Sequence, residues 1–159
     1  MQVADVDRPP ANGLTRSQMP VLVVDDNPGF LRVARAVLES LTPPFLVHTV
    51  QSGRGALAFL RREPPFTEAP TPAFVVLDLR LPDVDGPTVL RRIGEHETLR
   101  AIPVLVVSQA KWAEDEVAVR EAGALDFRVK PSRVDDLRDV FLDFWEGHVR
   151  DHHDSCDRR

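Results

Sequence analysis

Five polar side chains follow four apolar runs of the chain, and their types suit phosphoryl transfer. They are Asp25, Asp26, Asp78, Ser108 and Lys130. A carboxylate can attack a phosphorus atom and form an aspartyl phosphate. Neighbouring carboxylates repel one another unless a cation lies between them, and Mg²⁺ binds one or two carboxylates together with a phosphate oxygen. An ammonium group and a hydroxyl group can stabilise charge on the phosphoryl oxygens.

These residue types predict a role for each position. Asp78 is expected to be the nucleophile and, with Asp26, a direct ligand of Mg²⁺, while Asp25 acts through a water molecule. Lys130 and the metal ion are expected to supply positive charge, and the Ser108 hydroxyl one hydrogen bond. Singly, each residue has an ordinary explanation: the acid pair can cap the following helix, the serine can end a strand, and the lysine can be solvated. Their coincidence at four strand ends favours a single site.

The elements that must position these residues are visible as apolar runs that alternate with amphipathic stretches. This alternation predicts strands at 21–25, 45–50, 73–78, 103–108 and 125–129, and helices at 28–41, 53–63, 86–95, 112–122 and 133–149. Nearly continuous apolar strands predict a parallel sheet covered on both faces. The carboxyl ends of such strands form one edge, where ligands bind. The second strand is more polar and is expected at a sheet edge, and the prolines of residues 63–72 predict an extended connection.

Composition limits the number of domains and the kinds of partner. The 159 residues are 43% hydrophobic and 28% charged, as in one soluble α/β domain. We expect a flexible tail at 1–18, one domain at 19–149 and a charged tail at 150–159, with no room for a second domain. The only cysteine, Cys156, indicates a reducing, cytoplasmic compartment. A net charge of −5, scattered arginines and the lack of a long apolar run predict that neither nucleic acid nor membrane is bound.

The chain resembles the receiver domain of two-component response regulators over residues 20–147. The resemblance rests on Val-Asp-Asp-Asn at 24–27, Leu-Asp-Leu-Arg-Leu-Pro and a later Asp-Gly within 77–86, Val-Ser at 107–108 and Val-Lys-Pro at 129–131. It implies a flavodoxin-like, doubly wound five-stranded parallel sheet of order 2-1-3-4-5 with five helices. It also implies that a histidine kinase phosphorylates Asp78 and that Mg²⁺ is required.

Further site features are implied by the same resemblance. The backbone carbonyl of Arg80 is expected to bind the metal, and the Lys130–Pro131 peptide to be cis. Ser108 and Phe127 are expected to form a switch, in which the serine hydroxyl moves toward the phosphoryl group and the ring turns inward behind it. Phe127 stands where the family often has tyrosine, so its ring lacks a hydroxyl. The switch would change the surface made by the fourth helix, the fifth strand and the fifth helix.

A narrower resemblance is to the stand-alone regulators that are paired with bacterial phytochromes. It rests on the proline-rich insert, the Asp-Leu-x-Leu-Pro phrase at 78–82 and Phe-Leu-Asp-Phe-Trp at 141–145. It implies a single-domain protein, commonly dimeric, whose kinase is a red-light receptor. A sensor kinase that is not a phytochrome is the alternative partner.

The final predicted helix carries more apolar surface than one buried stripe requires. Val134, Leu137, Phe141, Phe144 and His148 fall on one stripe at helical spacing, expected to face the sheet. Leu142, Trp145 and Val149 fall on the neighbouring face, which would meet water in a monomer. We therefore expect a homodimer through this second face. The alternative is that Trp145 folds back onto its own domain.

Two other functions use similar residues. A haloacid-dehalogenase-type phosphatase also combines a nucleophilic aspartate, a lysine and an acid pair around Mg²⁺. That class needs an acid two residues after the nucleophile, where this chain has Arg80. An interaction module that is not phosphorylated would lose the acid pair or the lysine, and this chain keeps both. The prediction is a phosphoacceptor rather than an enzyme, beyond self-catalysed formation and hydrolysis of the aspartyl phosphate.

Overall fold

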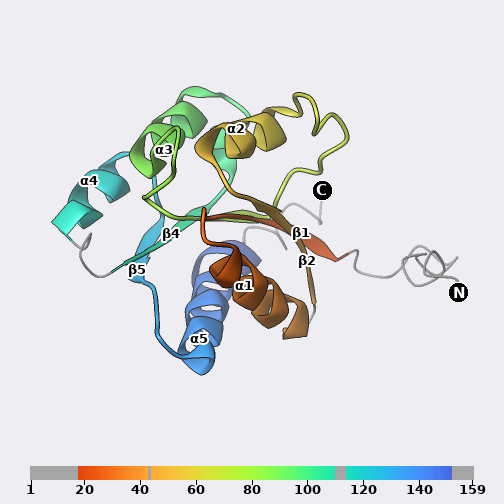
Figure 1. Ribbon diagram of the computed structural model, residues 1–159, viewed down its shortest axis with the longest axis vertical. Helices are drawn as coiled ribbons and strands as arrows, with labels where there is room; N and C mark the ends of the chain where they lie inside the picture. Colours follow the sequence, from red (N-terminus) through yellow and green to blue (C-terminus); the bar gives the residue numbers. More distant parts are fainter. Residues whose placement is uncertain (1–17, 43, 110–113, 152–159) are drawn as a thin grey trace, which may run out of the picture.

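The computed structural model describes residues 18–42, 44–109 and 114–151, in which strands and helices alternate (Figure 1). The strands are β1 Met19–Val24, β2 Phe45–Val50, β3 Phe74–Leu77, β4 Val104–Ser108 and β5 Asp126–Val129. The helices are α1 Pro28–Ser40, α2 Gly53–Arg61, α3 Gly86–Glu95, α4 Glu116–Glu121 and α5 Val134–Phe144. The short turns are the 3-10 helix η2 Leu99–Ala101 and the π-helix η4 Trp145–Val149.

The strands form one parallel sheet in the order β2-β1-β3-β4-β5. This order confirms the predicted flavodoxin-like fold and the edge position of the second strand. Helices α1 and α5 cover one face of the sheet, and α2, α3 and α4 cover the other (Figure 1). All strands therefore present their carboxyl ends at the same edge of the sheet.

Both faces of the central strands are buried, which explains their continuous apolar sequences. In β1, Val21 and Val23 belong to the core beneath α1 and α5, whereas Leu22 and Val24 belong to the core beneath α2 and α3. All four are at most 1% exposed. Strand β3 alternates in the same way. The polar residues that follow these strands therefore start from rigid, fully packed backbone.

The observed boundaries differ from the predicted ones mainly at helix ends. Helix α2 ends at Arg61 because Arg62 takes a left-handed conformation, with φ of 57°. The chain then runs through turns rather than a helix, as the prolines predict. The cis peptide found among the described residues is Pro64–Pro65, so the expectation of a cis Lys130–Pro131 peptide is wrong. The predicted start of the fourth helix at residue 112 lies outside the described residues.

The end of α5 corrects the prediction of an exposed second face. Helix α5 gives way to the π-helical turn η4, whose wider i→i+5 hydrogen bonding changes the direction of the side chains that follow. Trp145, the first residue of η4, continues the buried side of α5 and is 9% exposed. Val149, at the end of the turn, is 3% exposed, and Leu142 is half-buried against the same core. Val134, predicted to face the sheet, is 57% exposed instead. The alternative that Trp145 folds back onto its own domain is confirmed.

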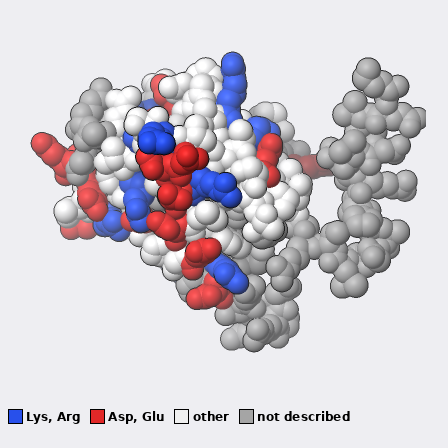
Figure 2. All heavy atoms as spheres, turned by 90° about the horizontal axis from the view of Figure 1, so that it is seen from below, with Lys and Arg blue, Asp and Glu red and all other residues white. Residues whose placement is uncertain are grey.

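Figure 2 shows the face at the bottom of Figure 1, where α1 and α5 lie, with acidic and basic atoms close together. Exposed charges on these helices include Arg32, Arg35, Asp136 and Asp139. A nucleic-acid interface usually needs a concentrated basic face, and this face is not one. No helix among the described residues combines the length and the apolar character needed to cross a membrane.

Candidate phosphoacceptor site

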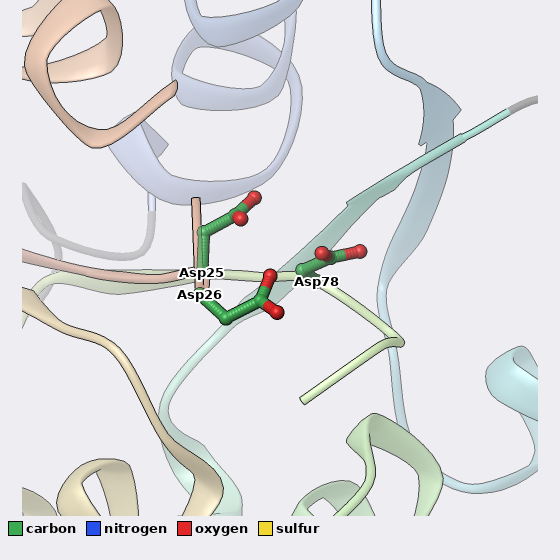
Figure 3. A group of neighbouring side chains, drawn as sticks. All are labelled: Asp25, Asp26 and Asp78. Carbon is green, nitrogen blue, oxygen red and sulfur yellow. The ribbon is translucent and has the colours of Figure 1, made fainter. Parts of the chain in front are cut away.

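Three carboxylates meet at the carboxyl edge of the sheet. Asp25 and Asp26 follow β1, and Asp78 follows β3, the strand beside it. Each offers an oxygen within 4.8 Å of the other two (Figure 3). Asp25 and Asp78 are 0% and 5% exposed, whereas Asp26 is exposed to solvent. The cluster is therefore buried on one side and open on the side of Asp26, so that an ion can reach it.

The residue that caps α1 is Asn27, and the acid pair does not do so. The Asn27 side-chain oxygen accepts hydrogen bonds from the backbone N–H groups of Gly29, at 2.9 Å, and Phe30, at 3.3 Å. The alternative reading of the acid pair as a simple helix cap is therefore wrong. Asp25 Oδ1 instead accepts the backbone N–H of Asn27, at 2.9 Å. This bond fixes the carboxylate of Asp25 toward the interior.

Lys130 brings a positive charge into the cluster. Its Nζ lies 2.6 Å from Asp25 Oδ2 and 3.4 Å from Asp78 Oδ2, and its side chain is 15% exposed. The ring of Phe30 lies on another side of the ammonium group, with its centroid 4.5 Å away. The backbone N–H of Lys130 donates to the Ser108 carbonyl oxygen at 2.7 Å, which holds the end of β5 beside β4. Sequence reasoning placed the lysine but missed Phe30, because only packing brings α1 against it.

Burial is the main reason why the pKa of Asp25 is raised above its ordinary value, and the nearby Asp78 carboxylate adds to the rise. The ion pair with Lys130 and the hydrogen bond from Asn27 oppose the rise without cancelling it. Asp25 Oδ2 is buried. Its partner is the Lys130 ammonium, and it accepts no well-directed hydrogen bond from the described residues. A cluster of oxygen ligands with surplus negative charge and such an atom fits a hard divalent cation.

Substitution of Asp25 by asparagine is expected to stabilise the cation-free protein near neutral pH. A raised folded-state pKa means that Asp25 contributes stability below its unfolded value of 3.8, and that this contribution is lost as pH rises through the folded value. At neutral pH the ionised carboxylate therefore lowers the free energy of unfolding. Urea titrations with a chelator should show the variant more stable than wild type near neutrality. The difference should shrink toward about pH 4, and a difference independent of pH would contradict the argument.

Ser108 ends β4, the strand beside β3, and Phe127 lies on β5, one strand further from the phosphoacceptor. The Ser108 hydroxyl is fully buried and donates to Asp78 Oδ1 at 3.0 Å. Phe127 is 6% exposed and packs in the core beneath α2 and α3. The Ser108 hydroxyl therefore already contacts the phosphoacceptor, and the Phe127 ring is buried. The exchange between two positions remains a prediction.

The loop between β3 and α3 carries Arg80, whose carbonyl is an expected metal ligand. This loop is closed at its base, because the backbone N–H of Gly86 donates to the Leu79 carbonyl oxygen at 3.0 Å. The exposed Arg80 side chain helps to line a cavity of about 230 Å³ with Asp85 and, from the start of α4, Asp115. This cavity is therefore bordered by charges of both signs.

The chain matches the family model of the response regulator receiver domain over residues 21–141. It belongs to this family. The receiver domain is 30% identical to response regulator Rcp1 of Synechocystis sp. over 117 residues, which are 74% of this chain and 80% of Rcp1.

Solved structures of other response regulators resemble this receiver domain. The phosphorylated cyanobacterial phytochrome response regulator RcpA is 30% identical, with a TM-score of 0.75 over 81% of this chain and 94% of RcpA. The Mn²⁺-bound form of Rcp1 is 27% identical, with a TM-score of 0.73 over 82% of this chain and 94% of Rcp1. The bacteriophytochrome response regulator RtBRR is 32% identical, with a TM-score of 0.68 over 79% of this chain and 77% of RtBRR.

Proposed function

We propose that this receiver domain accepts a phosphoryl group from a histidine kinase on Asp78, in a reaction that requires Mg²⁺. The observation that carries the proposal is the position of the Asp78 carboxylate. It lies in a cluster with two other carboxylates, and its own two oxygens contact the Ser108 hydroxyl and the Lys130 ammonium. Receiver domains of response regulators act as phosphoacceptors, and this chain keeps the residue types that the chemistry needs.

The residues of the chain divide the work as follows. A carboxylate oxygen of Asp78 forms a bond to the phosphorus atom while the phosphorus–nitrogen bond of a phosphohistidine breaks and the imidazole leaves. Lys130, already between Asp25 and Asp78, pairs with a phosphoryl oxygen, and the Ser108 hydroxyl donates to another. Asp26, Asp78 and the Arg80 carbonyl would hold Mg²⁺, with Asp25 acting through water, and the cation would supply further positive charge to the phosphoryl oxygens.

The proposed output is a change in the surface made by α4, β5 and α5. Phe127 lies on β5, and Ser108 ends the neighbouring strand β4. A phosphoryl group that accepts a hydrogen bond from the Ser108 hydroxyl therefore acts on the strand next to the one that carries the Phe127 ring. Phosphorylation would favour the inward state of both residues in an equilibrium between two states. The proposed location of the protein is the cytoplasm, because a single cysteine fits a reducing compartment.

For the kinase, we propose a bacterial phytochrome. The support is that RcpA is a phytochrome response regulator and RtBRR a bacteriophytochrome response regulator, and both resemble this chain over about four fifths of its length. Transfer from the autophosphorylated phytochrome to this chain should depend on red illumination. If transfer from the phytochrome were independent of light and an unrelated sensor kinase transferred its phosphoryl group efficiently, the results would favour a kinase that is not a phytochrome.

The phosphoacceptor function itself can be tested without the kinase. Incubation with acetyl phosphate and Mg²⁺ should add one phosphoryl group to the intact protein, detected by mass spectrometry, and a chelator should prevent the addition. A phosphatase of the haloacid-dehalogenase type would instead release phosphate from many monoesters at steady state. At the position where such a phosphatase needs a general acid, this chain has Arg80, which cannot donate a proton in that role.

Substitution of Asp26 by alanine should weaken Mg²⁺ binding while the fold persists. Asp26 is the exposed member of the carboxylate cluster, so its removal leaves the buried packing intact. We expect the dissociation constant for Mg²⁺ to rise by at least about tenfold, since even groups outside the ligand shell have effects of this size. Calorimetric titration would measure it, with unchanged circular dichroism as the control. An unaltered affinity would remove Asp26 from the proposed ligand set.

A further inference from the structure

A carboxylate from the loop after β3 is bound to the start of α2, far away in the sequence. Asp83 Oδ1 accepts the backbone N–H of Gly53 at 2.9 Å, and Asp83 Oδ2 accepts that of Arg54 at 3.1 Å. The loop and the helix also touch directly: a Cβ atom at Gly53 would collide with the carbonyl oxygen of Val84. Asp83 therefore fastens this loop to α2 with both of its oxygens.

This contact does what a local helix cap normally does. The first N–H groups of a helix have no partner within the helix and favour a negatively charged acceptor. Ser52, the residue before α2, accepts only from Gly55, at 2.9 Å. Burial acts to raise the pKa of Asp83, but hydrogen bonds from the backbone N–H groups of Val84, Arg54 and Gly53 hold it below its ordinary value. Asp83 thus accepts hydrogen bonds from the two N–H groups of α2 for which the Ser52 side chain provides no acceptor.

The same loop is held at its base beside the phosphoacceptor. The bond from the Gly86 N–H to the Leu79 carbonyl closes the loop, and Gly86 approaches so closely that a Cβ there would lie 2.7 Å from Leu79 Cα and 2.8 Å from the Asp78 carbonyl oxygen. Asp85 then caps α3 locally by accepting the Thr88 N–H at 2.9 Å. Arg80 lies between the closed base and the tip that Asp83 fastens.

We propose that Asp83 is a positioning residue for the cation site, because it holds the loop in the shape that presents the Arg80 backbone carbonyl to the cation. This inference rests on the proposed function, in which that carbonyl is a ligand. A backbone ligand on a free loop would have to be ordered at the moment of binding, at a cost in affinity. A loop that is fixed at both base and tip has already lost this freedom in the cation-free protein.

The test is the affinity of the full chain for Mg²⁺ alone, measured by calorimetric titration in matched variants. Asp83→Ala removes both contacts to α2 and should raise the dissociation constant by about tenfold, as loss of a supporting group typically does. Asp83→Asn keeps one acceptor oxygen and should recover part of the affinity. Asp85→Ala is the control, because it removes a carboxylate from the same loop whose hydrogen bond is to its own helix, at Thr88. It should change the affinity by less than about twofold.

A second readout does not involve the cation. Hydrogen exchange of the Gly53 and Arg54 amides without Mg²⁺ should be faster in Asp83→Ala than in wild type, and unchanged in Asp85→Ala. Wild-type Mg²⁺ affinity in Asp83→Ala with faster exchange would show that Asp83 is a helix cap only, and would overturn the proposal. Equal losses of affinity in the two alanine variants would also overturn it, since general destabilisation would then explain both.

Asp26→Ala separates this proposal from the proposed function beneath it. If Asp26→Ala loses Mg²⁺ affinity and Asp83→Ala does not, the cation site stands and the positioning role fails. If neither variant loses affinity, the cation site itself is wrong. Should Asp83→Ala fail to fold, Asp83→Asn decides alone: an affinity between wild type and Asp26→Ala supports the proposal, and wild-type affinity overturns it.

Discussion

Asp78→Asn is expected to abolish phosphoryl labelling by acetyl phosphate or by a phosphorylated kinase. The amide keeps the shape of the side chain, and its oxygen can still accept the Ser108 hydroxyl, which lies 3.0 Å from Asp78 Oδ1. It has no carboxylate oxygen that can attack phosphorus. Its NH₂ group also takes the place of Oδ2, which lies 3.4 Å from the Lys130 ammonium. Lys130 keeps its ion pair with Asp25, at 2.6 Å, so the variant should fold although it loses the nucleophile and one partner of Lys130.

The measurement is the mass of the intact protein after incubation with acetyl phosphate and Mg²⁺. The loss should be complete within detection, at least about a hundredfold, because removal of the atom that forms the bond leaves no alternative route. Asp85→Asn, a change to an exposed carboxylate that caps α3, is the matched control and should label like wild type. Full labelling of Asp78→Asn would show that another residue accepts the phosphoryl group.

The five strands and the meeting of their polar ends were predictable because the signals are local. In β3, each of Phe74, Val75, Val76 and Leu77 is at most 1% exposed. A run of four consecutive apolar residues therefore indicates directly that both faces of this strand are buried. Once the strands are parallel, the edge at which Asp78 lies follows from topology. No knowledge of side-chain packing is needed for these two steps.

Residues whose roles depend on competition or on distant contacts were missed. Three neighbouring residues can each cap α1, and Asn27 does so because Asp25 is turned inward by Lys130, which lies more than a hundred residues further along the chain. Asp83 reaches the first N–H groups of α2 from a loop that follows it by 29 and 30 residues. Spacing within a single element carries no trace of such contacts.

The π-helical turn η4 was misread for a related reason. Helical periodicity assumes a constant turn, and it put Leu142, Trp145 and Val149 on one outer face. The π-helical turn breaks this constancy after Trp145, and the indole itself meets Phe45 edge-on, with ring centroids 5.1 Å apart. The indole packs against β2, which lies about a hundred residues earlier in the sequence, so spacing within α5 gives no sign of this contact.

Trp145→Ala is therefore expected to destabilise the domain strongly, whereas an interface residue would have been replaced without loss of fold. The indole is 9% exposed and packs against Phe45 and Phe74, at 5.1 and 6.5 Å between ring centroids. Removal of so large a buried ring should lower the free energy of unfolding by about 3–5 kcal/mol. Trp145→Glu should be worse, because it also buries a charge without a partner. Urea unfolding followed by circular dichroism would measure both.

The matched control is Val134→Ala on the same helix, where a 57% exposed side chain should cost less than about 0.5 kcal/mol. If Trp145→Ala were as stable as this control, the indole would not be packed against β2. Sedimentation of the same samples then tests the predicted dimer face directly. Trp145 and Val149 are buried in their own domain, so Trp145→Ala should lose stability. If this variant instead changed from dimer to monomer and remained as stable as wild type, the result would contradict the structure.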